Sequence, residues 1–305
     1  MTQTLLQLPK RLYRTAKPAS SLQPHSLNMI GFGFDGTACF RKGTALAPDA
    51  IRMVASDIES YSPYLDLDLE ETETTPFYDL GNLVVQQSGD AQKDYLAVHE
   101  RFLELAGSHD FAGEGIKFLT LGGEHSISYS FIARYLQSFP DLVLLHLDAH
   151  ADLRDEYQGY HYSHASIIRR CLDHFGPGHQ LYQFGIRSGT RDEYTWMREN
   201  QTLAPSLDAF VAFIEGLPAH RPIYLTLDLD YFDPAFLPGT GTPEPGGQDF
   251  FSFIKIIQAL RHKNMVAADV VELSPPVDSS GNSDVFATKV VRELILTFQR
   301  EGSND

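Results

Sequence analysis

The sequence has few of the features that mark several large classes of protein. Only two of its 305 residues are cysteines, Cys39 and Cys171, which is too few for a disulfide framework or a cysteine-rich zinc site. No apolar run approaches the roughly 20 residues that a membrane-spanning helix requires. Basic residues are outnumbered 24 to 40 by acidic ones, and the net charge of −16 argues against nucleic acid as a partner. The simplest expectation is a cytoplasmic protein. The acidic charge fits a small cationic substrate; the alternative is that it only keeps the protein soluble.

The first 26 residues differ from the rest in charge. They contain only basic charged residues, and the first acidic residue of the chain is Asp35. An acidic-poor N-terminus can be a transit peptide, but Pro9 and Pro18 interrupt any helix here and no secretory apolar core is present. We therefore expect residues 1–26 to form a structural arm that packs on its own or a neighbouring subunit.

Apolar runs alternate with amphipathic stretches along the remaining chain, residues 27–305. This alternation predicts a three-layer α/β fold, in which a mostly parallel sheet of about eight strands carries helices on both faces. No internal repeat or low-complexity linker divides the segment, so we expect a single domain. Strands are expected near 28–33, 77–83, 116–121, 142–145, 181–186, 224–230 and 265–272, and helices near 48–59, 91–107, 128–138, 164–175 and 284–300.

One segment, His146-Leu147-Asp148-Ala149-His150-Ala151-Asp152, follows a buried strand and has no packing reason to be polar. Asp148, His150 and Asp152 occupy alternate positions, and in extended backbone alternate side chains point the same way. Close carboxylates repel one another unless a cation or a proton lies among them. The segment therefore predicts a metal site at the carboxyl end of a strand; the alternative is a solvated acidic loop.

Three other predicted strands also end in polar side chains. His125 follows the first within Gly122-Gly123-Glu124-His125-Ser126, Asp228 and Asp230 end the second, and Glu272 ends the third. The carboxyl ends of parallel strands meet at one edge of a sheet, where ligands bind in open α/β folds. A lone histidine at a strand end is more often a structural hydrogen-bonding residue, but this shared edge favours a ligand role for His125.

The charge of the six candidate ligands predicts the number of metal ions. Four aspartates contribute −4 and two neutral histidines contribute nothing, so two divalent cations balance the set, whereas one ion leaves buried carboxylates uncompensated. A ligand set rich in oxygen, with imidazole and without thiolate, suits Mn²⁺. Paired metal ions lower the pKa of a water molecule and orient it as a nucleophile. The candidate ligands are His125, Asp148, His150, Asp152, Asp228 and Asp230.

The sequence resembles the ureohydrolase (arginase/agmatinase) family over residues 28–298. Three motifs carry the resemblance: Gly-Gly-Glu-His-Ser at 122–126, Asp-Ala-His-Ala-Asp at 148–152 and Asp-Leu-Asp-Tyr-Phe-Asp-Pro at 228–234. The chain is more similar to agmatinases than to arginases. Arginases carry an Asn and Ser/Thr cluster after the second motif that binds the α-amino-acid end of the substrate, and this chain has Leu153-Arg154-Asp155-Glu156 there instead. The agmatinase-like segments are 34–37, 61–65, 163–166, 185–188 and 239–247.

The resemblance implies an arginase-like fold, a site with two manganese ions, and a homo-oligomer, often a trimer or hexamer. By position, His125 and Asp152 would hold one ion, His150 and Asp230 the other, and Asp148 and Asp228 would bridge them. Glu272 matches the carboxylate that pairs with the substrate guanidinium, and Asp152 would also steady the nucleophile. His164 matches the proton-shuttle histidine, with His161 as its competitor. Asp233 is expected to form a turn before Pro234.

The implied activity is hydrolysis of a guanidino compound to urea and an amine, with agmatine to putrescine as the leading case. Guanidinobutyrase is the nearest alternative, and Arg41, Lys42 or Arg154 facing the site would favour it; an acidic mouth, for example from Glu244, would favour agmatine. Arginase and formiminoglutamase activities are less favoured, and a non-catalytic binding relative least. Gly81-Asn82-Leu83 and Phe40-Arg41-Lys42-Gly43 depart from the family pattern and put the contacts to the distal end of the substrate in question.

Overall fold

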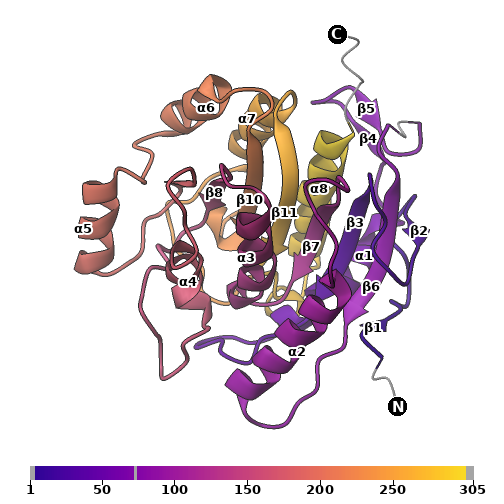
Figure 1. The fold of residues 1–305 in the computed structure, drawn as a ribbon, viewed down its shortest axis with the longest axis horizontal. Helices are drawn as coiled ribbons and strands as arrows, with labels where there is room; N and C mark the ends of the chain where they lie inside the picture. The colour runs from indigo at the N-terminus through magenta and orange to yellow at the C-terminus, as the bar shows by residue number, and fades with distance from the viewer. Residues whose placement is uncertain (1–3, 72–73, 300–305) are drawn as a thin grey trace.

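A computed structural model describes residues 4–71 and 74–299, and its centre is a single twisted sheet (Figure 1). Seven parallel strands form the body of this sheet, as predicted. Two short strands of the N-terminal segment, β1 (Leu6–Gln7) and β2 (Lys17–Pro18), pair with β6, so the described sheet has nine strands rather than about eight. The seven strands, in spatial order, are β6 (Phe77–Leu83), β3 (Leu27–Phe32), β7 (Lys117–Gly122), β11 (Asn264–Val271), β10 (Pro222–Asp228), β8 (Val143–Leu147) and β9 (Gln180–Phe184).

Helices cover both faces of the sheet, which confirms the three-layer prediction. Strands in such a sheet are buried on both sides and read as continuous apolar runs; in β10, Ile223 and Leu225 belong to the core on one face and Tyr224 to the core on the other. One face is covered by α1 (Ala47–Ala55), α6 (Leu207–Gly216), α7 (Phe250–Leu260) and α8 (Asn282–Phe298). The other, nearer the viewer in Figure 1, is covered by α2 (Ala91–Ala106), α3 (Ser128–Ser138) and α4 (Ile167–Leu172), and α5 (Arg191–Asn200) adds Met197 to its core.

Local sequence signals account for several of the helix ends. Asp90 caps α2 by accepting a hydrogen bond from the backbone of Lys93, and Thr190 and Glu193 form a capping box at α5. The helix expected near 164–175 begins instead as a 3₁₀ turn, His164–Ser166, before α4. Tyr61–Ser62 (β4) and Leu67–Asp68 (β5) form a separate small hairpin. Within residues 4–71 and 74–299, no helix is both long and apolar enough to cross a membrane.

The described part of the N-terminal segment packs against its own subunit. Tyr13 is buried, and its backbone N–H donates to Asp79 in β6 (3.0 Å). The Asp79 carboxylate also accepts hydrogen bonds from Nε and Nη2 of the buried Arg52, both at 2.8 Å. Arg14 forms an ion pair with Glu70 beyond the sheet edge. The segment is therefore tied to β6 through a buried ion pair of the main domain.

The order of the strands decides which loops meet at the carboxyl edge. Along the chain, the strands that precede the polar motifs are β7, β8, β10 and β11, with β9 between β8 and β10. In space they are direct neighbours, in the order β7-β11-β10-β8. The four predicted groups of polar side chains therefore come from four adjacent strands at the middle of the sheet.

Candidate metal centre and cleft

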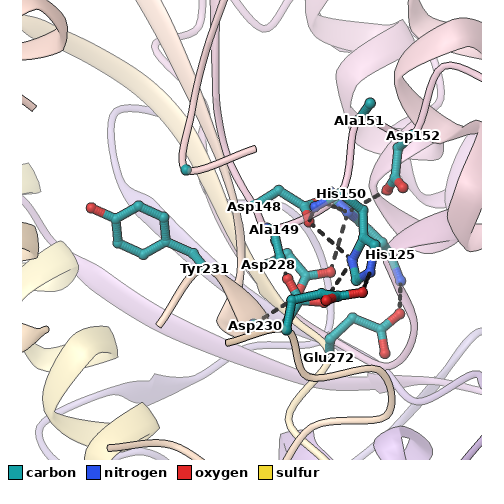
Figure 2. Close-up of polar contacts among 12 residues, drawn as sticks. His125, Asp148, Ala149, His150, Ala151, Asp152, Asp228, Asp230, Tyr231 and Glu272 are labelled. Carbon is teal, nitrogen blue, oxygen red and sulfur yellow. Dashed lines mark hydrogen bonds and ion pairs between the residues drawn. The ribbon is translucent and has the colours of Figure 1, made fainter. Parts of the chain in front are cut away.

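Three of the predicted ligands surround the imidazole of a fourth, His125, at this edge (Figure 2). His125 Nδ1 lies 3.0 Å from Asp148 Oδ2, 3.0 Å from Asp152 Oδ2 and 3.4 Å from Asp228 Oδ2. All four side chains are buried. Burial raises the pKa of Asp228, with Asp230 and Asp148 adding to the effect, and raises the pKa of Asp152 to about 7. These carboxylates can stay ionised together only if positive charge lies among them.

A second group of ligands surrounds the imidazole of His150. Its Nδ1 lies 2.9 Å from Asp230 Oδ2 and 3.6 Å from Asp148 Oδ1. Asp148 thus belongs to both groups, one oxygen facing each. The structure brings all six predicted ligands together in this way, as two groups that share one carboxylate.

Two buried atoms in this cluster point to a cation. His125 Nδ1 and Asp230 Oδ2 are both buried, and neither makes a hydrogen bond in the described structure. Buried polar atoms are almost always paired, so a pair of such atoms among carboxylates needs an explanation. Imidazole and carboxylate donors at these positions are suitable metal ligands, and the residues present therefore fit a metal centre.

Two residues beneath the cluster set the orientation of His125. Thr226 donates its hydroxyl proton to Asp269 Oδ1 (2.7 Å), so its oxygen is an acceptor for His125 Nε2 at 2.9 Å. The proton of His125 is then on Nε2, and the lone pair of Nδ1 faces the cluster. Hydrogen bonds of this kind to the remote nitrogen of a histidine fix both its tautomer and its ring orientation.

The backbone of the loops holds the aspartates in place as well. Asp148 Oδ1 accepts from the N–H of His150 (2.6 Å), Asp228 Oδ1 accepts from the N–H of Asp230 (2.8 Å), and Asp230 Oδ1 accepts from the N–H of Ala149 (3.0 Å). Asp152 adopts a left-handed backbone with φ of 54°. Left-handed backbone at a non-glycine residue costs on the order of 1 kcal/mol and occurs most often at functional sites.

A cleft of about 400 Å³ opens above the cluster and contains the other predicted site residues. Glu272 lines it, with a left-handed backbone (φ of 65°) and its Oε1 accepting from the N–H of His125 at 2.7 Å. His164 also lines it, and its buried Nδ1 makes no hydrogen bond in the described structure. Burial, followed by the nearby His150 and His125, lowers the pKa of His164 to about 4, so the resting ring is neutral. His161 is not among the lining residues and contacts Arg170 Nη1 at 2.9 Å, so the geometry favours His164 over its competitor.

Two of the four charged side chains that separate the substrate hypotheses, Arg154 and Glu244, line this cleft. The guanidinium of Arg154 stacks 4.6 Å from the Tyr157 ring, with its Nε 4.0 Å from Glu193 Oε2. Glu244 Oε1 lies 3.8 Å from His150 Nε2. Arg154 is therefore engaged with Tyr157 and Glu193, whereas Glu244 faces the cleft beside a metal-ligand candidate.

Arg41 and Lys42, the other two basic candidates, are directed at backbone carbonyls. Arg41 Nε donates to the carbonyl of Gly241 (3.1 Å) and Lys42 Nζ to that of Gly36 (3.2 Å), and neither lines the cleft. Of the two departures from the family pattern, Asn82 lies away from the cleft, where it donates to Asp49 and accepts from Arg52. Phe40 does line the cleft.

The structure also identifies supporting residues that sequence reasoning missed. Glu124 accepts hydrogen bonds from the backbone and hydroxyl of Thr37 and from the Ser126 hydroxyl, and so ties the turn after β3 to the site. Thr226 and Asp269 had a detectable signal, since each is a polar residue inside an apolar strand.

Asp233 forms the predicted turn, because its carboxylate accepts hydrogen bonds from the backbone N–H groups of Ala235, Gly246 and Gly247.

Comparisons with known proteins agree with this fold and identify the family. A sequence model of the arginase family matches residues 25–297, and the chain belongs to that family. It is 37% identical to the agmatinase of Bacillus cereus over 284 residues, covering 92% of this chain and 94% of the relative. It is 35% identical to the N(1)-aminopropylagmatine ureohydrolase of Thermococcus kodakarensis, covering 81% and 82% of the two chains. The crystal structure of a putative agmatinase from Clostridium difficile superposes with a TM-score of 0.78 at 34% identity, covering 90% of this chain and 98% of that one.

Proposed function

We propose that the protein hydrolyses agmatine to urea and putrescine, using two manganese ions per subunit. The observation that carries this proposal is the charge of the cleft: Glu272 and Glu244 line it above two groups of metal-ligand residues. A substrate that is cationic at both ends complements such a cleft, since opposite charge at close range favours binding.

In this proposal the six clustered residues hold the metal ions. His125 and Asp152 would hold one ion, His150 and Asp230 would hold the other, and Asp148 and Asp228 would contribute to both. Mn²⁺ is favoured because the donors are carboxylate oxygens and imidazole nitrogens without thiolate. When bound, the two ions lower the pKa of a water molecule and supply a nucleophile at neutral pH.

The remaining residues bind the substrate and move protons. Glu272 accepts hydrogen bonds from the guanidinium, which places the guanidinium carbon over the cluster. Asp152 accepts a hydrogen bond from the attacking water. Water oxygen bonds to the guanidinium carbon, the carbon–nitrogen bond to the alkyl chain breaks, and the leaving amine takes up a proton. His164, neutral at rest, relays that proton.

The side chains at the mouth favour an amine over a carboxylate at the far end of the substrate. Glu244 is accessible for a distal ammonium, whereas the charge of Arg154 is partly compensated by Glu193. Arg154 nevertheless lines the cleft, so 4-guanidinobutyrate remains the second candidate substrate. A substrate that carries a carboxylate there must draw Arg154 away from Glu193.

The test is a substrate panel with Mn²⁺-loaded protein. Release of urea is measured from agmatine, N(1)-aminopropylagmatine, 4-guanidinobutyrate, arginine and guanidine, and release of formamide from formiminoglutamate. We expect the highest kcat/KM for agmatine, and absence of turnover on all six substrates refutes the proposal. A metal-loaded protein that turns over none of them but holds a stable partner would indicate a binding relative.

The variant Glu244→Gln tests the distal contact. An exposed ion pair contributes about 1 kcal/mol, so the KM for agmatine should rise roughly fivefold while that for 4-guanidinobutyrate stays the same or falls. Glu215→Gln, an equal change of charge on the exposed surface of α6, is the matched control. Equal effects of both variants would remove Glu244 from substrate binding.

We also propose that the protein is a homo-oligomer, a trimer or hexamer, in the cytoplasm. Exposed aromatic side chains support assembly: Phe251 is 63% exposed and Phe236 is 51% exposed, and Phe236 lines an apolar groove together with Tyr64 and Phe250. Both cysteines are free, which fits a reducing compartment. Light scattering of the purified protein measures the mass, and a monomer at micromolar concentration contradicts the assembly.

A further inference from the structure

A row of buried polar side chains crosses the sheet one layer below the metal-ligand groups. Asp269 of β11, Thr226 of β10, His146 of β8 and Gln183 of β9 are successive cross-strand partners in the sheet register. All four are 0% exposed. Apolar residues would fill these positions without any need for hydrogen bonds, so each polar side chain here requires a reason. The first two orient His125, and the other two lead to Asp148.

The second half of the row is a continuous chain of hydrogen bonds. His146 Nε2 lies 2.8 Å from Asp148 Oδ2, and Gln183 Nε2 lies 3.0 Å from His146 Nδ1. Thr202, which follows α5, donates its hydroxyl to Gln183 Oε1 at 3.0 Å. The backbone N–H of Gln183 also donates to the carbonyl of Thr202 (2.7 Å), which keeps the two residues in contact.

The carbonyl of Ala151 determines which way the Gln183 amide points. The amide nitrogen lies 3.4 Å from this carbonyl oxygen, and a carbonyl can only accept a hydrogen bond. Turning the amide over would place two acceptor oxygens against each other. With the NH₂ group fixed in this direction, it donates to His146 Nδ1, so the single proton of the imidazole must be on Nε2, facing Asp148.

We propose that His146 is a positioning residue: held by Gln183 as its Nε2–H tautomer, it donates to Asp148 and orients the carboxylate that both metal-ligand groups share. Asp148 Oδ2 accepts a hydrogen bond from His146 Nε2, and Asp148 Oδ1 accepts one from the backbone N–H of His150. Each oxygen of a carboxylate has two lone pairs. One donor on each oxygen fixes the carboxylate plane and leaves one lone pair on each side for a cation.

The same geometry argues against a direct role for His146 as a ligand. His146 lies close enough to His125, Asp148 and Asp152 to share an ion with them on distance alone. A nitrogen that carries a proton cannot ligate a metal, and His146 Nδ1 faces away, toward Gln183. His146 therefore acts through Asp148. This inference rests on the proposed metal centre, and its test must separate the two.

The test compares two substitutions of the same histidine by amides. His146→Gln can place an amide N–H near the position of Nε2 and keep the donation to Asp148, whereas the shorter side chain in His146→Asn reaches only the position of Nδ1. Mn²⁺ is titrated into metal-free protein and the dissociation constants are measured directly, with urea release measured in parallel. Loss of partners that orient metal ligands typically costs 10- to 100-fold in affinity. We expect at least about tenfold weaker Mn²⁺ binding for His146→Asn and a change within about threefold for His146→Gln.

The outcomes separate the hypotheses. If the unaltered protein binds no divalent metal, the proposed function fails before the variants are compared. If it binds metal and both variants weaken binding alike, the donated hydrogen bond is not what matters, and the positioning role is refuted in favour of ligation or packing. If neither weakens binding, His146 does not orient Asp148.

A second variant keeps the inference testable if His146→Asn does not fold. Gln183→Met removes the amide that fixes the tautomer while keeping an unbranched side chain of similar volume. We expect weaker Mn²⁺ binding than in the unaltered protein, but by less than for His146→Asn, and a lower unfolding midpoint in the metal-free state because Thr202 and His146 lose a buried hydrogen-bond partner. Unchanged Mn²⁺ affinity in Gln183→Met would overturn the role assigned to Gln183.

Discussion

The substitution Glu272→Gln isolates the proposed contact between the protein and the guanidinium. The Glu272 side chain is buried, 7% exposed, and burial raises the pKa of its carboxyl. A cation that binds beside such a group relieves the cost of burying its charge. Glutamine keeps the shape and can still accept from the His125 backbone, but it presents an NH₂ group where the guanidinium requires an acceptor. Loss of one hydrogen bond to a charged group costs about 1.5–3 kcal/mol.

That cost corresponds to a fall in kcat/KM for agmatine of roughly 10- to 150-fold. Steady-state urea release measures it, and the Mn²⁺ content of the purified variant is measured alongside. We expect the metal content to stay unchanged because Glu272 is not among the proposed ligands. A kcat/KM within threefold of the unaltered protein, or an equal loss for the distant Glu215→Gln, would refute the assigned role. Loss of metal would instead indicate that Glu272 acts through the backbone of His125.

Three further predictions concern proton transfer, stability and pH. His164→Asn should lower kcat by about 100-fold or more with metal retained, whereas His161→Asn should change it little, as measured by urea release. Asp79→Asn should lower the free energy of unfolding by about 3–5 kcal/mol in urea titrations, because it removes the buried carboxylate that pairs with Arg52 and leaves only the half-exposed Asp49 at 4.0 Å. Hydrogen bonds from Ser280 and Ser283 lower the pKa of the Asp278 carboxyl from its ordinary value of 3.8 to about 2. The ionised carboxylate therefore contributes its full stabilisation of the fold at pH values above 3.8. The stability difference between the unaltered protein and Asp278→Asn should therefore shrink as pH falls from about 4 to about 2.

Much of the fold could be predicted because the signals were local. Apolar runs located all seven strands of the sheet body to within a few residues, and the β7, β8, β10 and β11 runs each led into a polar motif. The alternate spacing predicted that Asp148, His150 and Asp152 share one point, but the structure divides them: Asp152 lies beside His125, His150 lies beside Asp230, and only Asp148 faces both groups. The two edge strands β1 and β2 were missed because each is only two residues long and is stabilised by pairing with β6 rather than by its own pattern.

The supporting residues could not be predicted in the same way. Thr226, His146 and Gln183 lie in different strands, and nothing in one strand specifies the register of the next. Their polar character within apolar runs was visible, but their partners were not. The choice between Arg154 and Glu244 as the charge that meets a substrate tail also depended on Glu193, which approaches Arg154 from α5.

The sequence by itself determined the chemistry available at the site, because ligand type and alternate spacing within a strand end are local properties of the backbone. The tertiary structure decided which of these groups meet. The order β7-β11-β10-β8 makes neighbours of strands that are separated along the chain, and the register between them aligns the polar row beneath the ligands. Pairing between distant strands depends on the packing of the whole sheet, and for that reason the orientation of each ligand could be read only from the folded protein.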